Sequence, residues 1–309
     1  MRKIHSLGIF LSLWVGVANA STELSDAITN VRTACGGIGA ELTDMKKMAG
    51  INTVITGVGT ASGAVALGTG LAKLDIDEQI DAEFKKWAEK NKNVPVENLI
   101  IEEETFTVAI EEALSGNQGT DLQKLNDKSK LLGNIRTGTL AASTVTNIAG
   151  TAIAATNQIK GDFADQIQKC ISATQELSNA KMLAQVEGVA TESELATAEK
   201  MISACGEYEY IDISPINKRA TGAAIVSGVG MGSGVAGVIT SAIANTDKTR
   251  QAYDEQGVNK KAKDLNMTAN IMSGVSTAAS ATATVFNATQ IAAIKKLVAV
   301  SETCEGALK

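Results

Sequence analysis

The sequence has very little histidine, proline or aromatic residue. Its 309 residues include 1 His and 2 Pro, and only 3% are aromatic although 44% are hydrophobic. Large aromatic side chains supply much of the volume of ordinary globular cores. The only histidine is His5, so the chain after the first 20 residues cannot provide Ser-His-Asp catalysis, Cys-His catalysis or a histidine metal site. These shortages predict a protein that is not an enzyme and that has no cofactor and no metal site.

Positive charge is also in short supply. The chain has 28 Lys and Arg against 34 Asp and Glu, for a net charge of −6. Binding of nucleic acid depends on clustered basic side chains that neutralise phosphates. We therefore expect no nucleic-acid partner.

Residues 1–20 have the pattern of a secretory signal peptide. Arg2 and Lys3 precede an apolar run over 7–17, and residues 18–20 read Ala-Asn-Ala, which fits a cleavage site. The apolar run is too short to span a bilayer comfortably. The sequence thus predicts an exported chain that begins near Ser21 and resides in a membrane, in a periplasm or outside the cell.

Two parts of the chain resemble each other. The stretch GVGTASG at 57–63 recurs as GVGMGSG at 228–234, and NIRTG at 134–138 recurs as NIMSG at 270–274. A cysteine followed by glycine precedes each copy, at Cys35 and Cys205. An ordered match of this kind indicates an internal duplication. We expect an all-α fold of two duplicated antiparallel helical hairpins rich in Gly, Ala, Ser and Thr, over 21–170 and 205–309.

Four long segments without charge are expected to form the helices of these hairpins. Each exceeds the roughly 20 residues that cross a hydrocarbon core, and they are Met48–Ala72, Thr137–Ile159, Ala220–Thr246 and Leu265–Ile294. The first unit also carries an acidic helical insertion at about 73–130, with expected helices at 74–91 and around 104–114. Residues 171–204 are expected to form one connecting helix.

Four cysteines in an exported chain suggest two disulfides. The duplication favours Cys35 with Cys170 and Cys205 with Cys304, because these pairs would join the two ends of each unit. Four reduced, buried thiols are the alternative. A zinc site is disfavoured because no Cys-x-x-Cys spacing is present.

Small residues recur at helical spacing within the uncharged segments. Small-xxx-small faces allow helix backbones to approach closely, which drives association in lipid, whereas glycine costs a water-exposed helix about 1 kcal/mol relative to alanine. The residues expected to pack helices together are Gly57, Gly59, Gly63, Gly138, Ala142, Gly150, Gly228, Gly230, Gly232, Gly234 and Gly274.

Two functions fit this pattern. The preferred one is a non-enzymatic protein embedded in or inserting into a lipid bilayer, with a structural, assembly or pore-like role and a homo-oligomeric or protein partner. The five basic residues within 247–264 would then face the cytoplasm.

The alternative is a soluble periplasmic or secreted scaffold that binds a protein through the acidic insertion. It is supported by polar residues such as Asn52, Asn147 and Asn287, which dilute the apolar segments.

Overall fold

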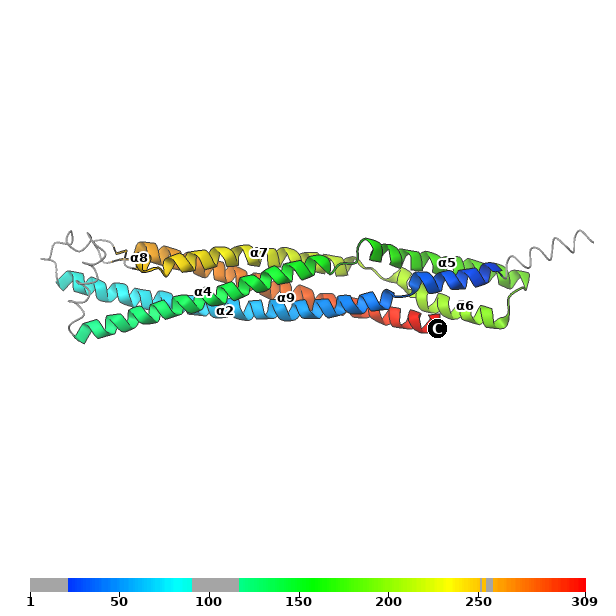
Figure 1. Ribbon diagram of the computed structural model, residues 1–309, viewed down its shortest axis with the longest axis horizontal. Coiled ribbons are helices and arrows are strands. Elements are labelled where there is room, and N and C mark those ends of the chain that lie inside the picture. Colours follow the sequence, from blue (N-terminus) through cyan, green and yellow to red (C-terminus); the bar gives the residue numbers. More distant parts are fainter. Residues whose placement is uncertain (1–21, 91–116, 251, 254–257) are drawn as a thin grey trace, which may run out of the picture. The chain divides into compact units, whose positions relative to one another are not determined.

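The computed structural model describes residues 22–90, 117–250, 252–253 and 258–309, and they are almost entirely helical, with no strand among them (Figure 1). The all-α prediction is therefore confirmed. Residues 1–20 and the helix expected around 104–114 lie outside the described residues. Residues 22–35 are helical, and the helices that follow are α2 (Ile38–Lys90), α4 (Asn117–Thr156), α5 (Asp162–Glu187), α6 (Glu192–Cys205), α7 (Ser214–Ala244), α8 (Asp247–Arg250) and α9 (Lys260–Leu308), with a 3₁₀ helix at Gly206–Tyr210.

The chain forms two compact units. One comprises Met1–Ile51, Ala154–Thr221 and Phe286–Lys309, and the other comprises Asn52–Ile153 and Gly222–Val285. We call the first the disulfide unit, because it holds both disulfides, and the second the four-helix unit.

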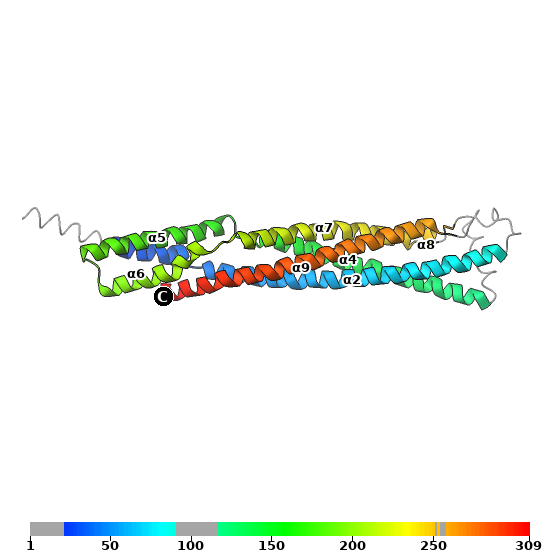
Figure 2. The same cartoon turned by 180° about the vertical axis from the view of Figure 1, so that it is seen from behind.

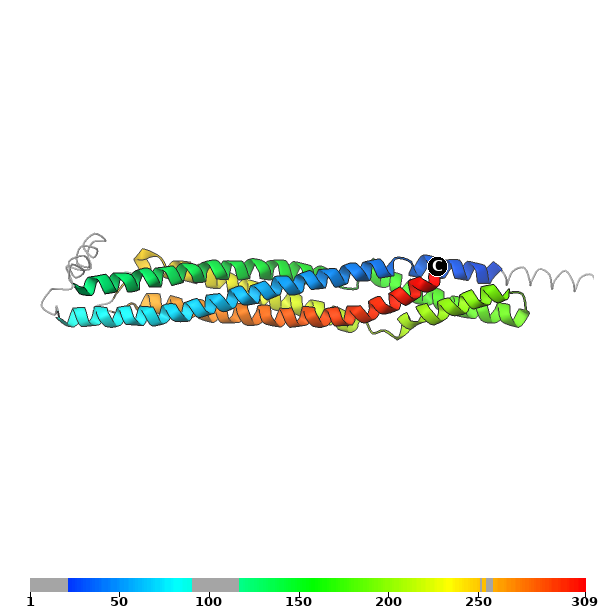
Figure 3. The same ribbon diagram turned by 90° about the horizontal axis from the view of Figure 1, so that it is seen from below.

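Within the four-helix unit, parts of α2, α4, α7 and α9 run alongside one another (Figures 1, 2 and 3). Asn52 bonds to Gly150 and Lys73 bonds to Ser129, so α2 and α4 run in opposite directions. Ser276 of α9 donates a hydrogen bond to Gly230 O of α7, and Met272 of α9 lies beside Gly237 of α7. Helices α7 and α9 therefore also run in opposite directions.

Helix α2 differs from the expectation in one respect. The uncharged segment and the amphipathic segment at 74–91 were expected as separate helices, but both belong to one helix of 53 residues. No glycine or proline stands between Lys73 and Lys90, so nothing interrupts the backbone hydrogen bonds. Ile76 and Ile80 on this extension are buried.

The disulfide unit has an ordinary apolar core. Its buried side chains include Leu24, Val31, Ile38, Leu177 and Met201. Burial of large aliphatic side chains contributes roughly 1.5–3 kcal/mol each. This unit therefore has the type of interior found in water-soluble helical proteins.

The connecting segment 171–204 is two helices rather than the single one expected. Helix α5 ends at Gly188, which adopts a left-handed φ of 65° and donates its N–H to Ala184 O. Helix α6 then begins with a capping box, in which the Thr191 side chain accepts from Glu194 N. The hydrogen bonds from Thr191 hold the pKa of the Glu194 carboxyl below its usual value. The break thus has a local chemical cause at both helix ends.

Candidate functional site

The interior of the four-helix unit is made of small polar side chains. Its buried apolar residues are mostly alanine, with Ile76, Ile80 and Leu140 as the larger ones. Beside them are the buried polar residues Asn52, Thr56, Ser143, Thr144, Asn147, Ser227, Ser241, Asn266, Asn270, Ser273, Ser276 and Ser280. Buried polar groups are costly unless hydrogen-bonded, so the contacts between these residues decide whether the arrangement is stable.

Hydrogen bonds cross this interior between helices. Ser143 of α4 donates to Gly59 O of α2 at 3.0 Å. Ser280 of α9 donates to Asn147 Oδ1 of α4 at 2.9 Å, and Asn147 Nδ2 donates to Ser276 Oγ at 3.4 Å. Such bonds require particular partners on particular helices, so they specify how the four helices pack.

Glycine brings the helix backbones close together at five of the predicted positions. A Cβ at Gly63 would lie 3.2 Å from Thr277 Cα, and one at Gly234 would lie 3.4 Å from Thr144 Cα. Gly59, Gly150 and Gly230 likewise face side chains of neighbouring helices. At each of these five glycines a Cβ would meet atoms of a neighbouring helix, and their role in holding the helices together stays a prediction.

The other predicted packing positions face away from the neighbouring helices. Among the described residues, no heavy atom of a neighbouring helix lies within 4 Å of an ideal Cβ at Gly57, Gly138, Gly228, Gly232 or Gly274. Ala142 is exposed as well. In this chain alone, these six positions therefore do not hold helices together.

Three close glycine contacts were missed by the sequence analysis. Gly70 faces Asn270, Gly133 faces Asn245, and Gly237 lies against Leu140 and Met272. Gly70 and Gly237 each follow an inward-facing glycine, Gly63 or Gly230, by seven residues, which is about two helical turns. That spacing is the signal that would have found these two glycines.

The outer face of the four-helix unit is apolar. Val54 is 67% exposed, Val145 64% and Ile225 62%. They belong to a larger set of exposed aliphatic side chains on the same four helices, namely Val54, Val58, Val65, Leu71, Leu131, Ile135, Val145, Ile148, Ile225, Val229, Val235, Ile239, Ile243, Met267, Ile271, Val275 and Val285. A high density of exposed aliphatic side chains marks a surface that contacts a partner or a membrane. Most of the larger aliphatic side chains of this unit are exposed, whereas many of its Ser, Thr and Asn side chains are buried.

Two helices in the described part of the chain are long and apolar enough to cross a membrane by length and composition. The first lies within Thr22–Lys86, a range that comprises the helix at 22–35 and most of α2, and the second is α7 (Ser214–Ala244). Only 28% of the most apolar 18-residue window of each is buried. The core helix of a water-soluble protein would bury most of such a window. Helices α4 and α9 do not reach the same hydropathy, because Ser, Thr and Asn occupy their inward faces.

Charged side chains gather at the end of the four-helix unit where α2 meets the first part of α4. Lys73 is 1% exposed, and its Nζ lies 2.7 Å from Asp77 Oδ2 and 2.8 Å from Ser129 Oγ. Asn266 of α9 also donates to Asp77 Oδ2, at 2.8 Å. Burial lowers the pKa of Lys73, and the nearby Asp77 carboxylate partly offsets this effect. A hollow beside this pair is lined by Asp81, Arg250 and Tyr253.

A second buried cation, Arg136, is bound by uncharged groups. It is fully buried, and its guanidinium donates to Ser241 Oγ at 2.8 Å, to Asn266 Oδ1 at 2.7 Å and to Asn270 Oδ1 at 3.3 Å. It therefore connects α4 to both α7 and α9. The sequence analysis missed this role, because Arg136 entered it only as part of the repeated NIRTG stretch at 134–138.

All four cysteines are buried in the disulfide unit. Cys35 is bonded to Cys170 and Cys205 to Cys304, which is the pairing that the sequence favours. Disulfides form and persist in oxidising compartments, so these bonds agree with an exported chain.

Comparison with models of known protein families, with curated proteins and with solved structures finds no match to this chain.

Proposed function

We propose that the four-helix unit is embedded in a lipid bilayer, as the membrane part of an exported, non-enzymatic protein with a structural or assembly role. The observation that carries this proposal is the orientation of side chains in this unit. Aliphatic residues such as Val54 and Ile225 face outward while Asn147 and Ser280 face inward. A lipid bilayer is the environment that suits an apolar outer face on all four helices, because hydrocarbon solvates aliphatic side chains and cannot solvate polar ones.

The lengths of the uncharged segments agree with this environment. The segment Met48–Ala72 has 25 residues without charge, which corresponds to about 38 Å of helix at a rise of about 1.5 Å per residue. A hydrocarbon core is about 30 Å thick. The buried Lys73 and Arg136 both lie just beyond the ends of uncharged segments, close to where a bilayer interface would be.

Internal packing supports an assembly role over a pore. The glycine contacts and the hydrogen bonds of Ser143, Asn147 and Ser280 fill the space between the helices in the described structure. In lipid, helix association depends on this kind of close packing and polar bonding. The outward-facing Gly228 and Gly232 are four residues apart, a spacing that suits contact with a further helix from a second copy or another protein.

The proposed duplication is supported by equivalent contacts in the two hairpins. Gly63 of the first glycine motif faces Thr277 of α9, and the corresponding Gly234 of the second motif faces Thr144 of α4. A duplicated pair of hairpins related by an approximate two-fold axis would produce such reciprocal contacts. If the N-terminus is exported and all four uncharged segments cross the bilayer, the four cysteines would lie on the outer side. The basic segment containing Lys248 and Lys260 would then lie on the cytoplasmic side, in agreement with the positive-inside rule.

Single tryptophan residues in brominated lipid test the proposal. In a chain whose Trp14 and Trp87 are replaced by Phe, we would introduce Val229→Trp or Ile239→Trp on the apolar face, and Tyr210→Trp in the disulfide unit as the matched control. Tyr210 is 81% exposed. We expect brominated acyl chains to quench the introduced tryptophan strongly in the two apolar-face variants, and iodide in the aqueous phase to quench it in the Tyr210→Trp control.

The opposite pattern would favour the second candidate, a soluble scaffold. If iodide quenches the introduced tryptophan in all three variants and brominated lipid quenches it in none, the apolar face does not contact lipid. The modest hydropathy of α4 and α9 supports this candidate. Release of the chain from membranes by an alkaline carbonate wash would point the same way.

A further inference from the structure

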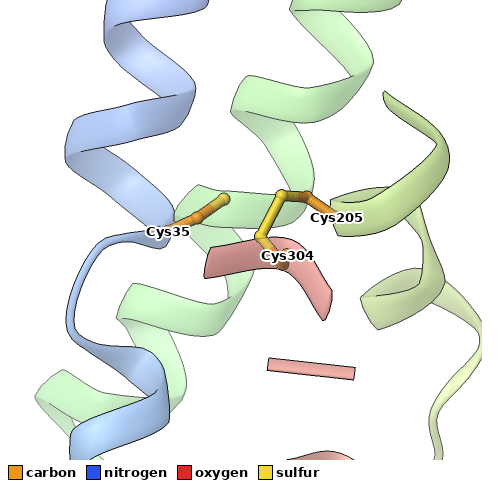
Figure 4. Close-up of side chains that lie close together, drawn as sticks. All are labelled: Cys35, Cys205 and Cys304. Atoms are coloured by element: carbon orange, nitrogen blue, oxygen red, sulfur yellow. A yellow bond between two sulfur atoms is a disulfide. The ribbon is translucent and has the colours of Figure 1, made fainter. Parts of the chain in front are cut away.

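Three sulfur atoms of the two disulfides lie close together. The Sγ atoms of Cys35, Cys205 and Cys304 are all within 4.8 Å of one another, and each residue is at most 1% exposed. Figure 4 shows the Cys35 side chain pointing toward the Cys205–Cys304 bond. The residues come from different elements: Cys35 ends the helix at 22–35, Cys205 ends α6, and Cys304 lies within α9.

This proximity puts the Cys35 sulfur within reach of the Cys205–Cys304 disulfide, which it could attack. Thiol–disulfide exchange proceeds by attack of a thiolate sulfur on a disulfide sulfur, with the second sulfur as leaving group. The partner of Cys35 is Cys170, whose sulfur does not belong to the group of three. Of the two cysteines in the first disulfide, Cys35 is therefore the one positioned for exchange.

We propose that the Cys35 sulfur is an exchange centre that couples the two disulfides of the chain. A dithiol reductant opens the Cys35–Cys170 bond, is itself oxidised to a disulfide by two electrons, and leaves thiols at Cys35 and Cys170. The Cys35 thiolate then attacks the Cys205–Cys304 bond. A new bond forms from Cys35 to one of these two sulfurs, the old bond breaks, and the departing sulfur takes up the proton that Cys35 lost.

The exchange step changes connectivity without any net oxidation or reduction. Before it, the cross-link joins α6 to α9, and after it, the helix at 22–35 is joined to α6 or to α9. The sulfurs need only close a gap of at most 4.8 Å to a bond length of about 2.05 Å. The disulfide unit can thus hold three covalent connectivities around one buried cluster.

A matched pair of serine variants tests the proposal. Cys170→Ser leaves Cys35 as a free thiol beside the second disulfide, and Cys35→Ser leaves Cys170 as a free thiol outside the group of three. Each purified protein is held at pH 8 without reductant and quenched with acid. It is then unfolded, alkylated and mapped by mass spectrometry of non-reduced peptides, and a non-reducing gel confirms that the chains are monomeric.

We expect Cys170→Ser to contain peptides linking Cys35 to Cys205 or Cys304, with the free thiol distributed over the three positions. The amount of such non-native disulfide should exceed that in Cys35→Ser by about tenfold, because exchange rates depend on access to the attacked sulfur. A Cys170→Ser protein whose thiol remains entirely on Cys35, with the Cys205–Cys304 bond intact, would overturn the proposal.

The wild-type chain provides a second measurement that does not depend on the variants folding. Treatment with one equivalent of dithiothreitol followed by acid quenching should yield species with a Cys35–Cys205 or Cys35–Cys304 bond and a free Cys170. If the partly reduced protein contains only native disulfides and free thiols, the coupling through Cys35 does not exist.

Discussion

Gly63 of α2 and Thr277 of α9 meet at backbone distance: a Cβ at Gly63 would lie 3.2 Å from the Thr277 Cα. Main-chain atoms cannot rotate away as a side chain can. The equivalent position in the second glycine motif, Gly234, has the same relation to Thr144 Cα at 3.4 Å. The closeness of these helices therefore depends on the missing Cβ at both sites.

Substitution of inward and outward glycines should have opposite effects. We expect Gly63→Ala with Gly234→Ala to lower the free energy of unfolding by about 1–3 kcal/mol per site, because the helices must move apart. The control pair Gly57→Ala with Gly138→Ala has open space at each Cβ. It should be neutral or stabilising by up to about 1 kcal/mol per site from helix propensity. Thermal unfolding followed by circular dichroism in detergent would measure both, and equal effects of the two pairs would contradict the close-packing role.

A more hydrophobic interior should make the four-helix unit less stable. Asn147→Leu removes the hydrogen bonds to Ser276 and Ser280 and adds bulk beside Gly230, so we expect a loss of about 1–3 kcal/mol. Ile148→Leu, at the neighbouring position that is 48% exposed, is the control and should change little. Stabilisation by Asn147→Leu in a denaturant titration would mean that the interior behaves as an ordinary hydrophobic core.

Replacing one member of the Lys73–Asp77 pair should lower the free energy of unfolding more than replacing both. Asp77→Asn leaves the Lys73 charge buried without its carboxylate, and we expect a loss of about 3–5 kcal/mol. The loss should shrink as the pH rises, because burial already lowers the pKa of Lys73 and neutral lysine tolerates the site better. The double variant Lys73→Met with Asp77→Leu should recover most of the stability.

The exposed pair Lys86–Glu83 is the control for this experiment. Its side chains are 69% and 45% exposed, so Glu83→Gln should cost less than about 0.5 kcal/mol. Unfolding titrations at several pH values would compare the four proteins. A loss in Asp77→Asn no larger than that in Glu83→Gln would show that Lys73 is not desolvated.

Tyr208 should make the disulfide unit sensitive to alkali. Desolvation raises the pKa of the buried Tyr208 hydroxyl from 10.0 to about 12, and Glu305 adds to the rise. Ionisation then favours the unfolded chain between these two values, so the tyrosine's contribution is intact below pH 10 and is lost as the pH rises through about 12. This rise in pKa corresponds to roughly 3 kcal/mol of stability.

The variant Tyr208→Phe isolates this effect. At pH 7 its stability should lie within about 1 kcal/mol of the wild type, and between pH 10 and 12 it should decline less than the wild type does, because phenylalanine does not ionise. The measurement is the difference in unfolding free energy between the two proteins across this range. Parallel curves up to pH 12 would contradict an elevated pKa.

The all-α fold and the disulfide pairing could be predicted because they depend on the order of residues along the chain and not on the rotation of each helix. Uncharged runs mark long helices whatever their rotation, and the ordered repeat of cysteines favoured Cys35 with Cys170 and Cys205 with Cys304. The break at Gly188 was also available in the sequence. Thr191 precedes Glu194 by three residues, which is the spacing of a capping box, but the Ala- and Glu-rich composition around it led to the expectation of a single helix.

The rotation of each helix about its axis could not be predicted in the same way. Gly57 and Gly59 are two residues apart, and one faces open space while the other faces Thr146. Mean hydropathy also ignores direction, so Asn147 was counted against a membrane location although it lies inside and is hydrogen-bonded. Which residues face inward depends on all four helices together, and this information is absent from any one segment.

The inward placement of small polar residues also affects how the four-helix unit tolerates mutation over evolutionary time. In the proposed bilayer location, Val, Ile, Leu and Met on the outer face would replace one another freely, since lipid accommodates any aliphatic shape. Inside, a site such as Gly63, or Ser276 with its bond to Gly230 O, admits few alternatives. Substitutions should therefore accumulate fastest at the most hydrophobic positions and slowest at the glycines and serines, the reverse of the pattern expected where a hydrophobic core determines the fold.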